Sequence, residues 1–256
     1  MSNLSPDHPQ KTAASPLRGP QEKLLAAALC CLISVLGGCR STPGLVSCWH
    51  AENSPADRVG ANDGILKQGA AYGPGIKGQA FKFGAIGDAV SASTHGIPVG
   101  IHDRTLVCWV YLNAIPGESG SEAFFVGYGK FASYGQVYCL GALADHRLFF
   151  SQWGNAIIGP RLTLGEWHHV AATSFDAHTV LYLDGARVAS GALDFNTPPA
   201  TEFHIGFVDA PLRTRQTVGL IDEVAVYNRA LPPEEIQALF RAGSAGIPKP
   251  PKTKGQ

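Results

Sequence analysis

The sequence lacks an excess of charge of either sign. Its 20 lysine and arginine residues are balanced by 20 aspartate and glutamate residues. A chain with no net charge has no long-range field that would draw it to nucleic acid or to an anionic membrane surface. We therefore expect no nucleic-acid partner. The length, 256 residues, is enough for one domain with a sizeable core.

Long hydrophobic runs are also scarce, and the longest apolar stretch lies near the N-terminus. It extends from Leu24 to Leu36 and follows Lys23, as the hydrophobic part of a secretory signal follows its basic part. As a helix this stretch rises about 20 Å, which is less than the roughly 30 Å of a bilayer's hydrocarbon core. We therefore expect a signal peptide at residues 1–38 rather than a membrane span.

The apolar stretch ends in Leu36, Gly37, Gly38 and Cys39. These four residues resemble the lipobox of bacterial lipoproteins, in which the cysteine thiol takes a diacylglycerol and becomes the first residue of the mature chain. The resemblance implies lipidation of Cys39, a short linker at residues 39–43, and a lipid-anchored location on the bacterial cell envelope, facing the periplasm or the exterior. A chance match in an ordinary cytosolic or secreted chain is the alternative.

An even set of cysteines is missing from the predicted mature chain. Once the signal is removed and Cys39 is acylated, Cys48, Cys108 and Cys139 remain. An odd number cannot form a closed disulfide framework. We expect buried free thiols that pack as small hydrophobic side chains, with a disulfide between Cys48 and Cys108 as the alternative.

Helical periodicity is rare after residue 44, where short apolar or alternating runs are separated by glycine, aspartate, asparagine and proline. Such runs predict β-strands. Asp184-Gly185, between two alternating runs, predicts a two-residue hairpin turn. One segment, residues 232–240, has the spacing of a short helix, with Gly243 just past its end. The sequence thus predicts an all-β, two-sheet sandwich with one C-terminal helix.

The order of five segments carries a resemblance. "GLVSCWHAENSPADRVGANDGIL", "GQAFKFGAIGDAVSA", "RTLVCWVYL", "GEWHHVAATSFDAHTVLYLDGARVASG" and "GLIDEVAVYNRALPPEEIQALF" together resemble the laminin-G-like jelly-roll domain of the concanavalin A-like lectin/glucanase superfamily. The resemblance implies an antiparallel jelly roll over residues 44–243. The proline- and lysine-rich residues 244–256 predict a disordered tail.

The glucan hydrolases of that superfamily carry a Glu-x-Asp-x-(x)-Glu run on one strand, and this sequence has none. Two carboxylates must flank a glycosidic bond, so they must share a face. The nearest pairs are Asp222 with Glu223, which are neighbours on a strand, and Glu118 with Glu122 in a glycine-rich loop. We therefore predict that the protein is not an enzyme, with a glycoside hydrolase as the less favoured alternative.

Two histidines and two tryptophans in apolar strands are expected to be structural. His168 and His169 are neighbours and face opposite ways on a strand, so they cannot chelate one ion together. One should face the core and the other the surface. Trp49 and Trp109 are expected in the core rather than as sugar platforms.

A Ca²⁺ site is predicted from hard oxygen donors. Glu52, Asp57 and Asn62 lie in a loop interrupted by proline and glycine, and carboxylates, amides and carbonyls are the ligands of Ca²⁺. Asp222 is expected to share a strand face with Leu220, Val224 and Val226, where a carboxylate needs a cation or several donors. The resemblance implies a structural Ca²⁺ held by Asp57, Asn62, Asp222 and Glu52. The alternative is that the turn acids cap their own backbone and that Asp222 pairs with an arginine.

The function implied is binding rather than catalysis. We expect a lectin-like module that binds carbohydrate through loops on one rim of the sandwich, with a protein-interaction scaffold as the alternative. Aromatic or planar side chains in turn-rich stretches are the candidate ligand contacts. They are Tyr128, Tyr134, Trp153, Asn155 and Arg213.

Overall fold

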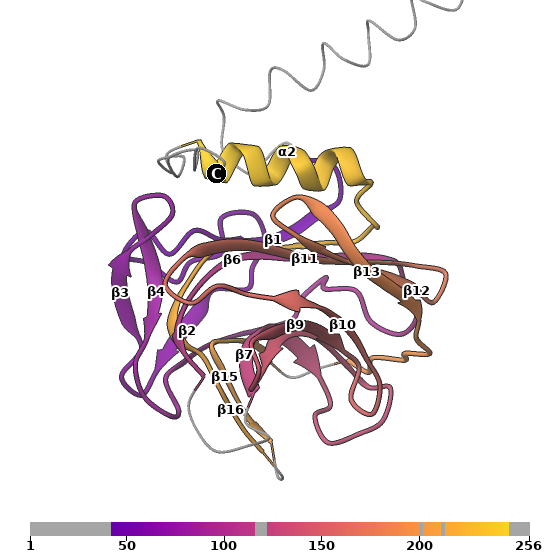
Figure 1. Cartoon of the computed structure of the whole chain (residues 1–256), viewed down its shortest axis with the longest axis horizontal. Coiled ribbons are helices and arrows are strands. Elements are labelled where there is room, and N and C mark those ends of the chain that lie inside the picture. The colour runs from indigo at the N-terminus through magenta and orange to yellow at the C-terminus, as the bar shows by residue number, and fades with distance from the viewer. Residues whose placement is uncertain (1–41, 116–121, 200–201, 211–212, 246–256) are drawn as a thin grey trace, which may run out of the picture. The chain divides into compact units, whose positions relative to one another are not determined.

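The computed structural model describes residues 42–115, 122–199, 202–210 and 213–245. All of them lie in one compact unit, Cys39–Gln256. They form two β-sheets that face each other, with a helix outside the first sheet (Figure 1). The predicted all-β sandwich with one helix near the C-terminus is confirmed.

The first sheet has eight strands: β1 (Leu45–Trp49), β3 (Ala71–Pro74), β4 (Gln79–Phe83), β6 (Arg104–Ala114), β11 (Trp167–Phe175), β12 (His178–Leu183), β13 (Ala186–Ala192) and β17 (Val218–Tyr227). Their order is β13-β12-β11-β6-β17-β4-β3, and β1 pairs with β17. These pairings are antiparallel. The first described strand therefore lies beside the last.

The second sheet has nine strands: β2 (Gly64–Lys67), β5 (Ala89–Ala92), β7 (Glu122–Gly129), β8 (Val137–Leu143), β9 (Arg147–Ser151), β10 (Ala156–Arg161), β14 (Phe203–Ile205), β15 (Phe207–Ala210) and β16 (Arg213–Gln216). Their order is β10-β9-β8-β7-β14-β5-β2. β15 and β16 form a hairpin, and β16 pairs with the start of β7 through Arg215 and Glu122. This hairpin therefore brings Arg215 of β16 next to Glu122 of β7, although the two residues are far apart in the sequence.

The core lies between the sheets. Alternate residues of each strand point inward, because successive side chains of a strand face opposite ways. Trp49 of the first sheet stacks on Phe203 of the second, with 4.9 Å between ring centroids. Trp49 is fully buried and Trp109 is 2% exposed, which confirms that neither is a sugar platform.

A second apolar cluster lies under the helix α2 (Pro233–Ser244). Ile236 is buried there with Tyr182 and Tyr227, and Phe240 stacks on Trp109 at 5.6 Å. Pro232 makes no side-chain capping bond, as expected for a proline at that position. The helix is longer than predicted and includes Gly243, because a glycine lets the helix approach the Trp109 indole closely.

The predicted hairpin turn is confirmed. The turn Asp184–Gly185 joins β12 to β13 with φ values of 50° and 77°, the left-handed pair that a two-residue hairpin needs. The two histidines lie on opposite faces of β11, as predicted, and His169 is 1% exposed. The other histidine is not at the surface as expected, because the His168 side chain is only 12% exposed and pairs with Asp184 at 3.0 Å.

The three described cysteines are buried, as expected, and the alternative disulfide between Cys48 and Cys108 is not formed. Cys48 belongs to the cluster under α2, and Cys108 to the core between the sheets. The first sheet therefore lies between these two side chains.

The predicted face of Asp222 is right for Leu220, which lies two positions before it in regular pairing, and wrong for Val224 and Val226. A bulge shifts the register of β17 between Asp222 and Ala225, and Glu223 takes a left-handed φ of 48°. Because one extra residue reverses the alternation, Val224 and Val226 face the core while Asp222 faces outward.

Candidate functional site

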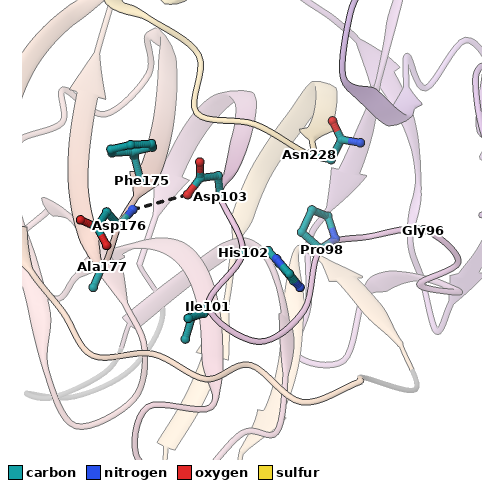
Figure 2. Close-up of a pocket in the computed structure, with 9 residues that line it drawn as sticks. All are labelled: Gly96, Pro98, Ile101, His102, Asp103, Phe175, Asp176, Ala177 and Asn228. Atoms are coloured by element: carbon teal, nitrogen blue, oxygen red, sulfur yellow. Dashed lines mark hydrogen bonds between the residues drawn. The ribbon is translucent and has the colours of Figure 1, made fainter.

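A cavity of about 780 Å³, termed the larger cavity, lies at the rim of the sandwich. Its walls come from the segment between β5 and β6, the β11–β12 turn, and the residue after β17 (Figure 2). The lining residues are Gly96, Pro98, Ile101, His102, Asp103, Phe175, Asp176, Ala177 and Asn228.

A buried arginine fixes one wall of this cavity. The Arg104 guanidinium donates to the carbonyl oxygens of Pro98 (3.0 Å), Val99 (3.1 Å) and Gly100 (2.6 Å). It also donates to the Tyr128 hydroxyl at 2.9 Å. Arg104 Nε donates in addition to the His102 carbonyl oxygen at 2.8 Å. Five acceptors on one fully buried side chain hold the β5–β6 segment in one conformation.

The chemistry of the larger cavity is acidic and apolar. Asp103 Oδ1 accepts a long hydrogen bond from the Asp176 backbone N–H, at 3.4 Å (Figure 2). Ile101 and Phe175 are exposed beside them, at 69% and 63%. None of the predicted ligand residues lines this cavity.

The smaller cavity, of about 350 Å³, contains two of the predicted ligand residues, Trp153 and Asn155. It lies where β7, the β9–β10 turn and β16 meet. The other lining residues are Glu122, Ser151, Gly154, Ala156 and Arg215.

One wall of the smaller cavity is an ion pair covered by an aromatic ring. Arg215 Nη2 lies 2.8 Å from Glu122 Oε2. The Arg215 guanidinium carbon lies 4.4 Å from the centroid of the Trp153 ring, within cation–π distance. Trp153 has a φ of 70°, a left-handed conformation that bulky residues rarely adopt.

Tyr134 provides a platform beside this cavity. Its ring lies against Gly154, and its hydroxyl accepts a hydrogen bond from Asn155 Nδ2 at 2.8 Å. The side chain is nevertheless 64% exposed. The structure therefore brings Tyr134, Trp153 and Asn155 together.

Of the other two predicted ligand residues, one is buried away from this group and the other has no described side chain. Tyr128 is 1% exposed, and its hydroxyl donates to the Pro98 carbonyl oxygen at 2.7 Å, so it supports the rim from inside and cannot contact a ligand. Arg213 lies in β16, and its side chain falls outside the described residues.

Sequence reasoning missed Arg215 as a site residue and considered Glu122 only as part of an acid pair. Glu118, the other acid of that pair, lies outside the described residues. The ion pair of Glu122 with Arg215 joins β7 to β16, and no local pattern marks such a long-range pairing. The one usable signal was the acidic Glu122 at the start of an otherwise apolar strand.

The four residues predicted to bind a metal fall into two groups. Asp57 accepts from the backbone N–H groups of Cys48 (2.9 Å), Val59 (3.0 Å) and Asn62 (3.2 Å). The Asn62 amide donates to Ser47 Oγ at 2.7 Å and accepts from the His95 backbone N–H at 2.7 Å. In this group the oxygens of Asp57 and Asn62 are used by the chain's own backbone and side chains.

Glu52 and Asp222 form the second group, at the β3–β4 turn. Asp222 Oδ2 accepts from the backbone N–H groups of Ile76 (3.0 Å) and Lys77 (3.3 Å), and Glu52 lies against Gly78. Burial, together with the negative charge of Glu223, raises the pKa of Asp222 to about 7. Among the described residues no three His, Cys, Asp or Glu side chains converge on one metal position.

The predicted signal peptide and Cys39 lie outside the described residues. In the part of the chain that is described, no helix has the length and apolar character to cross a membrane.

Comparison with known families finds one match. Residues 83–237 match a laminin G-type model described as the concanavalin A-like lectin/glucanases superfamily. A comparison with curated protein sequences finds no match.

Solved structures share the fold at low sequence identity. One is domain 4 of an extracellular arabinanase from Geobacillus stearothermophilus, in complex with arabinotriose, with a TM-score of 0.61, 17% identity, and coverage of 77% of this chain and 98% of that one. Another is a Trypanosoma rangeli sialidase, with a TM-score of 0.62 and 20% identity, where 82% of this chain matches 34% of the sialidase. The binding domain of Paraclostridial Mosquitocidal Protein 1 has a TM-score of 0.60 and 15% identity, with 78% and 52% coverage.

Proposed function

Because the chain belongs to the concanavalin A-like lectin/glucanase superfamily, we propose that it is a non-catalytic module that binds carbohydrate through the smaller cavity. The observation that carries this proposal is the grouping of Tyr134, Trp153 and Asn155 at one place on the surface. The arabinanase domain solved with arabinotriose supports the same class of ligand.

The physical basis is a fixed aromatic platform beside polar groups. One face of the Tyr134 ring lies on Gly154, and its hydroxyl is held by Asn155, so the ring keeps its orientation while the side chain stays exposed. The C–H face of a sugar stacks on such a ring, and hydroxyl groups bond to the amide and charged groups next to it. The Tyr134 side chain would lose little mobility when a glycan binds, because it is already ordered.

A glycan array with residues 40–245, which end after α2, tests the proposal. We expect Tyr134→Ala to weaken binding about tenfold, from the loss of one stacking contact. Phe175→Ala is the matched control, since Phe175 is an equally exposed aromatic residue at the larger cavity. Loss of binding in Phe175→Ala alone would move the site to the larger cavity.

A protein-interaction scaffold is the second candidate, and one observation favours it. Ile101 and Phe175 stand exposed together at the larger cavity, as apolar residues do at protein interfaces. Recovery of one envelope protein by the wild type but not by Phe175→Ala, with no glycan bound, would favour the scaffold.

The absence of catalysis is part of the proposal. A glycosidase needs two carboxyl groups across the scissile bond, and the described lining of the smaller cavity offers Glu122 as its one carboxylate. We expect no reducing sugar to be released from a panel of β-glucans. Enzyme-dependent release would point instead to Asp103 and Asp176 of the larger cavity.

We further propose that the module is anchored on the bacterial envelope through a lipid on Cys39. The support is the Leu-Gly-Gly-Cys sequence at the end of the apolar stretch. Metabolic labelling with a fatty acid tests it. Label should enter the wild type and not Cys39→Ala, and an unlabelled wild type contradicts it.

A structural Ca²⁺ is proposed at Glu52 and Asp222. Both carboxylates lie against the β3–β4 turn, where the Lys77 carbonyl oxygen and Asp222 Oδ2 both lie close to Gly75. Hard oxygen donors of this kind fit Ca²⁺, which when bound would neutralise the buried Asp222. To bind it, Asp222 would have to exchange hydrogen bonds from the backbone N–H groups of Ile76, Lys77 and Glu223 for the ion. Asp57 and Asn62 would keep their own hydrogen bonds and support the first loop.

A further inference from the structure

The smaller cavity has a buried ion pair in its wall. The side chains of Glu122 and Arg215 are each 8% exposed, and their facing atoms are 2.8 Å apart. Among the described lining residues these two carry the only formal charges. The described lining therefore has no net charge, although it contains a strong donor beside a strong acceptor.

The guanidinium of this pair is only partly satisfied. Arg215 is 7% exposed, and its Nε and Nη1 atoms are buried without a hydrogen-bond partner among the described residues. Unpaired buried donors of a charged group are costly, and most native structures supply an acceptor. The cavity next to Arg215 is where an acceptor from outside the chain would enter.

We propose that this acceptor is a hydroxyl group of a neutral sugar, so that the module selects uncharged glycans with free hydroxyl groups over acidic ones. The proposal rests on the proposed function and names its ligand class. A hydroxyl accepts from Arg215 and donates to Glu122 at the same time. A ligand carboxylate cannot donate and would add a negative charge next to Glu122, whereas an ammonium cannot accept from Arg215.

Trp153 controls access to the guanidinium. Its ring lies over the Arg215 guanidinium, 4.4 Å from centroid to carbon, and the Nε and Nη1 atoms of that guanidinium are buried. We infer that the ring covers these atoms. A sugar hydroxyl reaches these atoms only when the ring shifts. Binding of the right ligand should therefore change the fluorescence of Trp153.

The experiment compares matched ligands on the full-length chain. Trisaccharides of glucose, galactose and mannose are each titrated beside the uronic acid trisaccharide of the same linkage. For any pair that binds, we expect the neutral sugar to bind at least tenfold more tightly than its uronic acid counterpart. The neutral sugar should also change the tryptophan emission of the wild type but not of Trp153→Phe.

Glu122→Gln tests the origin of this preference. It keeps the size of the side chain and removes the negative charge, so the neutral-to-acidic affinity ratio should fall at least tenfold. Glu235→Gln is the matched control, because Glu235 lies on α2, outside the other sheet, where it pairs with Arg229. In this variant the neutral-to-acidic affinity ratio should stay as in the wild type. Melting curves show whether Glu122→Gln is folded. If it is not, the comparison of neutral and uronic acid trisaccharides on the wild-type protein still tests the inference.

The outcomes separate this inference from the proposed function. Binding of acidic sugars as tightly as neutral ones, or tryptophan emission that is unchanged on binding, overturns the inference and leaves carbohydrate binding intact. No binding of any glycan, on the array or in the titrations, overturns the proposed function itself.

Discussion

His169 is the clearest case of a titratable side chain used as packing. Its ring lies 5.3 Å from that of Trp109 and 6.0 Å from that of Phe240, and neither ring nitrogen has a hydrogen-bond partner among the described residues. Burial lowers the pKa of His169 to about 4, with a small opposing effect from Asp184. The side chain is therefore neutral in the folded protein over the physiological range.

This shift predicts a loss of stability in mild acid. In the unfolded chain a histidine has a pKa near 6.5, whereas the pKa of folded His169 is about 4. Neutral His169 therefore makes its full contribution to the free energy of unfolding above pH 6.5, and this contribution is lost as the pH falls toward 4. The shift corresponds to about 3 kcal/mol. His169→Leu removes the titrating group and two unpaired nitrogens, so its urea-unfolding free energy should fall less between pH 7 and pH 4.5. His178→Gln, at an exposed position, is the control, and parallel wild-type and His169→Leu curves would contradict the prediction.

At the same scale, Tyr134 and Tyr128 show what the sequence could not distinguish. Both are tyrosines close to turns, and both were predicted to contact a ligand. Tyr128 is instead the partner of Arg104 in the core, a contact across 24 positions of the chain. Exposure is decided by such long-range partners, which no local pattern reveals.

Among the elements, α2 depends on a glycine that the sequence suggested was outside it. A Cβ added at Gly243 would overlap with the indole of Trp109. The last turn of the helix can therefore pack on β6 only with glycine at this position. The segment was predicted as a helix from its apolar spacing, but its end was set by this packing contact.

Gly243→Ala should therefore destabilise the fold, although alanine is the better helix former. Overpacking of this kind costs about 1–3 kcal/mol, because the helix or the indole must move. Gly84→Ala is the control, since the nearest atom to its added Cβ would be 3.9 Å away. Chemical unfolding measures both variants. If Gly243→Ala and Gly84→Ala had the same free energy of unfolding, the prediction would be wrong, and the end of α2 could move away from Trp109 without cost.

The strands were more predictable than their irregularities. The alternating runs predicted the hairpin at Asp184–Gly185, because the turn residues and the period agree. The bulge at Asp222–Ala225 was not predictable, since its extra residue is set by pairing with β6. One unpredicted residue was enough to separate Asp222 from the face of Val224 and Val226.

For the molecule as a whole, the sequence predicted the layers and part of the site. Trp153 and Asn155 were chosen for their type and their turn-rich surroundings, and they line one cavity. The ion pair that completes the cavity was not found, because Glu122 and Arg215 meet only when the β15–β16 hairpin pairs with β7. Binding sites built from several segments depend on topology, which single-sequence patterns do not determine.

The proposed Ca²⁺ concerns the whole fold, since Glu52 follows the first strand and Asp222 lies in the last. Both approach the β3–β4 turn, so an ion there would join three distant parts of the chain. Ligand at 100 times its dissociation constant stabilises the folded state by about 2.7 kcal/mol. In a domain of this size that is a melting shift of roughly 5–10 °C.

EDTA should therefore lower the melting temperature of the wild type and leave Asp222→Asn, which lacks one ligand, almost unchanged. Asp57→Asn is the matched control, because that carboxylate bonds to backbone N–H groups of the first loop. It should lower stability and still respond to EDTA as the wild type does, because Asp57 supports the loop without binding the ion. Equal EDTA shifts in the wild type and Asp222→Asn would remove Asp222 from the site. An EDTA-insensitive wild type without bound Ca²⁺ in metal analysis would mean that backbone hydrogen bonds alone compensate the buried Asp222.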